Sequence, residues 1–128
     1  PGTVITYVPP EGTTRVVYRF HYSSYFYNAQ PIIHNKFFID GSEVVHARHN
    51  MNAYYSELKN VFEWTIAIGG VANTYTGRVS SWTTPKTLYM QHRNYGASDQ
   101  IYLFGTSYWD GAGTGIFSQP SLTITAIA

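Results

Sequence analysis

The sequence predicts an all-β domain, a jelly roll or β-sandwich of about eight short antiparallel strands. Two observations support this fold class, and a third indicates the number of domains. Apolar and polar residues alternate with period two along most of the chain. The alternating runs are rich in β-branched and aromatic residues, and clusters of Gly, Pro and Asp separate them. A length of 128 residues fits one domain with one core, so we expect residues 1–128 to form a single unit.

Two strands are expected in the first 22 residues. The run TVITYV at residues 3–8 is β-branched and ends at the turn sequence PPEG, residues 9–12. Residues 14–22 then alternate as a half-buried antiparallel strand does. The residues expected to face inward are Val16, Tyr18, Phe20 and Tyr22. A polar and aromatic loop is predicted at residues 23–31.

Residues 32–49 predict a β-hairpin. Asp40-Gly41 lies between two β-rich runs, and this dipeptide favours the positive φ angles of a type I′ turn. Residues 50–55 are predicted to form a loop after the hairpin.

Residues 56–68 show the clearest alternation. One side of the expected strand carries Leu58, Asn60, Phe62, Trp64, Ile66 and Ile68. A helix would place Phe62 and Ile66 on one face but would leave Trp64 off it. The β-branched and aromatic content also favours a strand.

The remaining elements follow the same pattern. Residues 69–77 are expected to form a loop or short strand, and a strand is predicted from about Lys86 to Tyr95. Residues 96–100 form a turn sequence before a further strand at 101–107. The chain closes on the period-two run SLTITAIA, residues 121–128.

Composition limits the classes of partner. Charged residues make up 12% of the chain, the net charge is +1, and no Lys/Arg cluster is present, so nucleic acid is not an expected partner. The chain has no cysteine, which excludes disulfides and thiolate metal sites. No apolar run approaches the roughly 20 residues of a membrane helix. Low charge and 12 tyrosines favour a domain that hides surface in an assembly. Pro1 in place of Met suggests a processed or excised domain.

The sequence YWDGAGTGIFSQP, residues 108–120, contains three alternating glycines. A dinucleotide-binding loop needs a helix after its glycines, and Pro120 with the β-branched run that follows excludes one. We interpret the stretch as a loop that leads into the last strand. Trp109 and Asp110 pair an aromatic ring with a carboxylate, as a sugar site does, but an aromatic that anchors the loop is the commoner role.

Neither the histidines nor the acids suggest catalysis. His46 and His49 are three residues apart, which sends them to opposite faces of a strand. A zinc site built from the distant His34, His46 and His92 stays an alternative, whereas the expected role of the histidines is on polar and interface faces.

Paired carboxylates at glycosidase spacing are also missing. Glu57 and Glu63 share a strand face, but six residues of strand separate them by roughly 20 Å. The nucleophile elbow Gly-x-Ser-x-Gly is absent as well. We therefore predict no catalytic residue, metal or cofactor, and no enzyme.

Five segments together resemble a β-rich domain found in structural proteins of tailed bacteriophages, especially marine phages. They are spread along nearly the whole chain, at residues 7–23, 34–48, 62–68, 81–96 and 108–128. The most specific parts are IDGSEV, YWDG and the terminal LTITAIA. The resemblance implies a compact jelly roll like the heads of tumour necrosis factor and C1q, and such domains typically form trimers. It implies no catalytic residue.

The expected function is therefore that of a phage virion structural protein on the virion surface. It would be a homotrimeric module of a fibre, an appendage or a capsid decoration, in contact with other virion proteins and with a host surface glycan or receptor. The alternative is a carbohydrate-binding module or lectin that uses loop aromatics. The residues expected to bind such a ligand are Tyr54, Tyr55, Tyr108, Trp109 and Asp110, with Trp82 as a further stacking platform.

Overall fold

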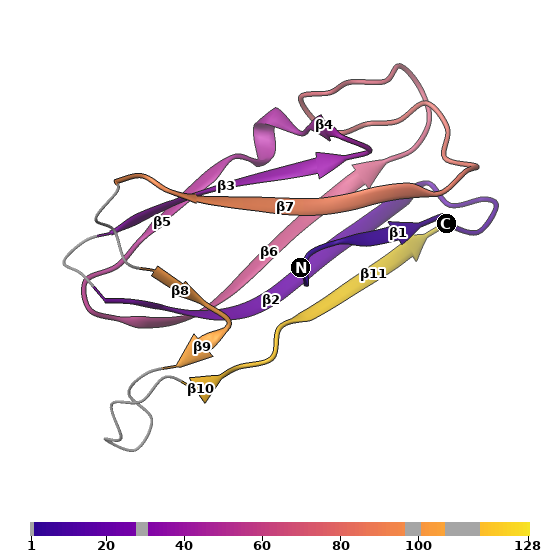
Figure 1. Ribbon diagram of the computed structural model, residues 1–128. Coiled ribbons are helices and arrows are strands. Elements are labelled where there is room, and N and C mark those ends of the chain that lie inside the picture. Colours follow the sequence, from indigo (N-terminus) through magenta and orange to yellow (C-terminus); the bar gives the residue numbers. More distant parts are fainter. Residues whose placement is uncertain (1, 28–30, 97–100, 107–115) are drawn as a thin grey trace.

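The protein is all-β, as the alternation predicts. The structure is a computed structural model that describes residues 2–27, 31–96, 101–106 and 116–128. In Figure 1, two antiparallel sheets face each other, and the connections gather at the two ends. Over the described residues the only helical element is a single 3₁₀ turn, η1 (Val45–Ala47).

Within the described residues, one sheet has five strands and the other has four. The first sheet runs in the order β1 (Ile5–Tyr7), β7 (Lys86–Asn94), β3 (Ile32–Ile39) and β4 (Ser42–Glu43), and β5 (His49–Asn52) also pairs with β3. The second runs in the order β11 (Ser121–Ile127), β2 (Arg15–Phe26) and β6 (Glu57–Ala67), and β8 (Ile101–Leu103) pairs with the end of β2. A small ribbon joins β9 (Gly105–Thr106) to β10 (Ile116–Phe117). Consecutive long strands alternate between the sheets, as in Greek-key and jelly-roll sandwiches.

The core lies between the sheets and is largely aromatic. Val16, Tyr18 and Phe20 of β2 are fully buried, which confirms the predicted inward face of this strand. The Tyr18 ring lies 4.8 Å from that of Phe37 on β3, so the two sheets meet ring against ring. The buried Tyr18 hydroxyl donates to the carbonyl oxygen of Thr3 at 2.5 Å, which satisfies the polar atom in the core.

Two predicted loops are strand in their first part. The loop predicted at 23–31 is wrong in its first half, because β2 continues to Phe26 and buries that ring. Ser24 is tolerated inside because the Asn60 amide donates to its hydroxyl at 2.8 Å. The loop predicted at 50–55 is wrong in the same way, because β5 extends through Asn52. There the side chain of Asn50 accepts a hydrogen bond from His34 on the paired strand.

The predicted hairpin is right at its turn and wrong in its return arm. Asp40 and Gly41 have φ angles of 49° and 82°, as a type I′ turn requires. The returning strand β4, however, is only two residues long and gives way to η1. Val44 and Ala47 are both buried, and a separation of three residues puts them on one side only when the chain curls.

The other strong alternations are confirmed. β6, β7 and β11 correspond to the predicted strands at 56–68, at about 86–95 and at 121–128. The connection between β6 and β7 is anchored by two indole N–H groups. Trp64 donates to the carbonyl oxygen of Thr76 at 3.0 Å, and Trp82 donates to that of Tyr7 at 3.1 Å.

Candidate functional site

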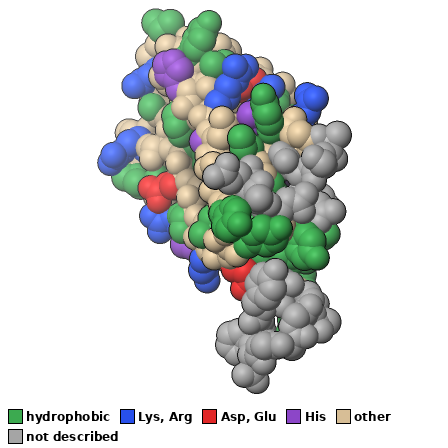
Figure 2. Space-filling model, turned by 90° about the vertical axis from the view of Figure 1, so that its left-hand side faces the viewer, with side chains coloured by type: hydrophobic (Ala, Val, Ile, Leu, Met, Phe, Trp, Pro, Cys, Tyr) green, Lys and Arg blue, Asp and Glu red, His purple; other side chains and the backbone are tan. Residues whose placement is uncertain are grey.

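The strand β2 ends, β6 begins and β8 lies alongside at one end of the sandwich, at the left of Figure 1, and these elements carry several exposed aromatic residues. Figure 2 views the molecule from this side and shows hydrophobic side chains grouped over its lower part. The exposed residues on these elements and on the nearby ribbon are Tyr27, Tyr54, Tyr55, Tyr102 and Phe117, here called the aromatic end. Tyr54 and Phe117 are 63% and 70% exposed, far more than a core anchor would be.

The tyrosines of the loop before β6 hold one another in place. The rings of Tyr54 and Tyr55 meet edge to face with centroids 5.0 Å apart, and Tyr27 lies 6.5 Å from Tyr55. Tyr55 has a φ of 43°, a conformation unusual for a residue with a side chain. The Ser56 hydroxyl donates to the Tyr54 carbonyl oxygen at 2.7 Å, which closes the turn. The loop therefore presents its rings in a defined arrangement.

A stacked pair continues the aromatic end along β2 and β8. Tyr25 and Tyr102 are paired across the strands, and their rings lie 4.5 Å apart at an angle of 17°. A side chain at Gly105 would come within 3.2 Å of the Tyr25 ring, so the glycine allows β9 to approach this stack. The Thr106 hydroxyl next to it donates to Glu57 at 2.8 Å, which fixes β9 to the start of β6.

The structure brings together only part of the predicted ligand set. Tyr54 and Tyr55 are exposed and adjacent, as expected. Trp82 is wrong as a stacking platform, because it is buried and packs edge to face on Tyr7. Tyr108, Trp109 and Asp110 lie outside the described residues. Sequence reasoning missed Tyr27 and Tyr102, whose only signals were a tyrosine in the expected loop at 23–31 and a tyrosine in the expected strand at 101–107.

The histidines of the alternative zinc site lie in separate environments. His46 is exposed on η1 and packs against Tyr75, with ring centroids 5.5 Å apart. His34 points outward from β3 and bonds Asn50, whereas the His92 ring on β7 faces the core. Over residues 2–27, 31–96, 101–106 and 116–128, no group of three or more His, Cys, Asp or Glu side chains could hold a metal ion.

The two acids that share a face of β6 are also engaged separately. Glu63 forms an ion pair, at 2.5 Å, with Arg19 on the neighbouring strand β2. Glu57 accepts the hydrogen bond from Thr106. They belong to two different polar contacts on the surface of the sheet.

The imidazole of His92, on β7, is half-buried and faces Tyr22 between the sheets. The Nδ1 of His92 donates to the side-chain oxygen of Asn35, while its Nε2 is shielded from solvent and has no hydrogen-bond partner among the described residues. Burial, with a smaller contribution from nearby His49, lowers the pKa of His92 to about 4. Burial also raises the pKa of the neighbouring Tyr22 hydroxyl to about 12. Both groups are therefore neutral near pH 7.

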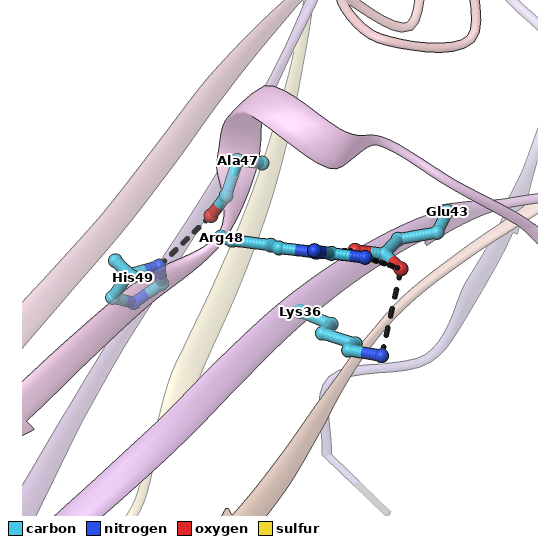
Figure 3. A network of polar contacts seen from close by, with 5 residues as sticks. All are labelled: Lys36, Glu43, Ala47, Arg48 and His49. Atoms are coloured by element: carbon cyan, nitrogen blue, oxygen red, sulfur yellow. Dashed lines mark hydrogen bonds and ion pairs between the residues drawn. The ribbon is translucent and has the colours of Figure 1, made fainter.

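A charged network lies at the other side of β3, in Figure 3. Arg48 contacts both carboxylate oxygens of Glu43, at 2.5 and 3.0 Å, and Lys36 lies 3.5 Å from the same carboxylate. The hydrogen bond from Arg48 lowers the pKa of Glu43 below its ordinary value. Beside this network, His49, the first residue of β5, donates from Nδ1 to the carbonyl oxygen of Ala47 at 3.0 Å.

Comparisons with known proteins leave the family of this chain open: no protein-family model, no curated protein and no solved structure matches it. Among the described residues, no helix is long and apolar enough to cross a membrane.

Proposed function

We propose that this chain is a structural and adhesive module of a bacteriophage virion, which forms a homotrimer and presents its aromatic end to another virion protein or to the host surface. The observation that carries the proposal is the aromatic end itself. Exposed apolar groups that gather at one place mark interaction sites, and tyrosine is enriched at the centre of protein interfaces. The low charge of the chain and its resemblance to phage structural domains support the same function.

The outer face of the β11–β2–β6 sheet is the better candidate for the contact between copies. Cross-strand rows on this face place Thr125, Val17 and Thr65 side by side, with Val61 further along β6 and 56% exposed. Its central charges, Arg19 and Glu63, neutralise each other. The outer face of the other sheet carries the cations Lys36, Arg48 and Arg93, which would repel the same face of a second copy. Burial of β-branched side chains around a three-fold axis would drive assembly.

Light scattering on the purified chain tests the assembly. We expect a trimer at micromolar concentration, and Val61→Lys should shift it to monomer because three unpaired ammonium groups would be buried. Val71→Lys is the matched control, since Val71 is 87% exposed in the connection between β6 and β7.

A wild-type monomer or dimer would contradict the trimer, as would equal effects of the two substitutions. The virion setting needs its own measurement. An antibody raised against the chain should label purified particles of the phage that encodes it, and unlabelled particles would count against a virion role.

A second function, that of a lectin for neutral sugars, is favoured by one observation. The paired rings of Tyr54 and Tyr55, fixed beside Tyr27, offer the kind of platform on which the apolar face of a sugar ring stacks. A glycan array should then show binding that Tyr55→Ala abolishes. Tyr75→Ala, which removes an exposed tyrosine from a different loop, should leave binding unchanged. An array without signal would eliminate this function.

A further inference from the structure

The outer face of β3, β5 and β7 collects basic and amide side chains from three strands. His34 lies opposite Arg93 of β7 and opposite Asn50 of β5, and Lys36 lies opposite Gln91. Arg48 reaches the same region from the residue before β5. These six residues, here called the cationic face, are His34, Lys36, Arg48, Asn50, Gln91 and Arg93.

The cationic face contains two hollows that share a ridge. One, of about 390 Å³, is lined by side chains that include Arg48 and Asn50. The other, of about 530 Å³, is lined by Gln91 and Arg93 among others. His34 and Lys36 line both hollows and therefore separate them. An elongated ligand laid across the ridge would meet a positive side chain in each hollow.

The positive charge of this face is only partly neutralised inside the protein. Glu43 takes up Arg48 and contacts Lys36, so one carboxylate serves two cations. The Arg93 guanidinium and the Gln91 amide have no hydrogen-bond or ion-pair partner in the part of the chain that the structure describes. A guanidinium without an internal partner can receive a carboxylate or sulfate in a bidentate contact.

The other groups on this face suit a saccharide. Tyr95, which follows β7, is 71% exposed, and its ring meets that of His34 at 5.6 Å. One open ring beside a guanidinium can take the apolar face of a sugar while the cation takes its acid group. The Gln91 and Asn50 amides both donate and accept, as hydroxyl groups require. Single-stranded nucleic acid is a poorer fit, since its binding sites supply a series of aromatic rings for successive bases.

We propose that the cationic face binds a short stretch of acidic polysaccharide, with its carboxylate or sulfate groups on Arg93 and Lys36 and a sugar ring on Tyr95. The site lies on the other sheet from the face assigned to self-association. It stands whether or not the chain forms a trimer.

Biolayer interferometry on the full chain tests the proposal with four probes: polygalacturonate, sulfated dextran, plain dextran and poly(dT). We expect binding to one or both acidic polysaccharides, and the two distinguish a carboxylate from a sulfate site. Arg93→Gln should weaken that binding at least about tenfold, because it removes a charge-assisted contact. Raising NaCl from about 0.05 M to about 0.5 M should weaken it further.

Arg15→Gln is the matched control, since it makes the same charge change on the second sheet and should leave binding unchanged. Thermal melts of both variants check that the fold is intact, which we expect because Arg93 has no hydrogen bond or ion pair to lose within the described residues. Three results would overturn the proposal: no binding to either acidic polysaccharide, equal loss in both variants, or binding to plain dextran or poly(dT) as tight as to the acidic probes.

Discussion

At the scale of single residues, His92 is a half-buried group whose surroundings oppose its protonation. Its Nδ1 is satisfied by Asn35, but protonation of Nε2 would place a positive N–H in a shielded position without an acceptor. The surrounding Tyr22 and His49 rings offer no negative charge. The folded protein therefore resists the protonation that the unfolded chain accepts readily.

This resistance makes the stability depend on pH. The pKa of His92 is about 4 in the folded protein and about 6.5 in the unfolded chain, so the unfolded chain binds more protons between these values. The contribution of neutral His92 to the free energy of unfolding is complete above pH 6.5 and is lost as the pH falls toward 4. We expect the free energy of unfolding, measured with urea, to fall by about 1–2 kcal/mol between pH 7 and pH 5.

His92→Gln removes the titrating group and should flatten this dependence. His46→Gln changes an exposed histidine and should preserve it. The ion pair of Glu43 with Arg48 does not interfere with this measurement. The pKa of Glu43 lies below its ordinary value, so this carboxyl is protonated only at lower pH. An unfolding free energy in the wild type that is the same at pH 7 and pH 5 would show that His92 is accessible to protons in the folded state.

At the scale of the elements, the turn between β3 and β4 connects the hairpin to the rest of its sheet. Asp40 accepts a hydrogen bond on its carboxylate from the Thr87 N–H at 3.0 Å, and its own N–H donates to the Thr87 carbonyl at 2.8 Å. The turn thus holds β7 as well as the two strands that it joins. Both of its central residues have positive φ, which Gly41 adopts without steric cost.

Gly41→Ala isolates the conformational cost of this turn. No atom of the described residues lies within 4 Å of the position that the new methyl group would take, so crowding does not contribute. The φ of 82° alone should lower the free energy of unfolding by about 1–2 kcal/mol. Chemical denaturation measures it, with Ser42→Ala at the next exposed position as the control within about 0.5 kcal/mol. Equal stability of Gly41→Ala and the wild type would mean that the turn relaxes to another type.

At the scale of the whole molecule, the two sheets share one core but have unlike outer faces. Rings from both sheets meet at Tyr18, Phe37 and Phe62, with centroid distances of 4.8 to 6.0 Å. Outside, the first sheet carries the cationic face and the second carries threonine and valine rows around the neutralised pair of Arg19 and Glu63. Because of this asymmetry, the uncharged rows of the second sheet suit self-association, whereas the first sheet suits an acidic ligand.

Local sequence was enough to predict the class of fold and most of its long strands. Period-two alternation identified the inward face of β2 and the course of β6, β7 and β11, because the face on which a side chain lies depends only on its position along its own strand. Asp40-Gly41 likewise determined its own turn. Where polar residues interrupted the alternation, as at Ser24 and Asn50, the prediction ended a strand too early, since their partners are on other strands.

Only the tertiary structure decided which residues lie together at the candidate sites. Tyr27, Tyr55 and Tyr102 come from three separate segments, and Arg93 meets His34 through the register of two strands far apart in the sequence. Trp82 was buried and Tyr54 exposed although both are aromatic residues in connections. A sequence records the side of a strand that a residue occupies. Its neighbours across the sheet depend on pairing and register, which the packing of the whole core selects.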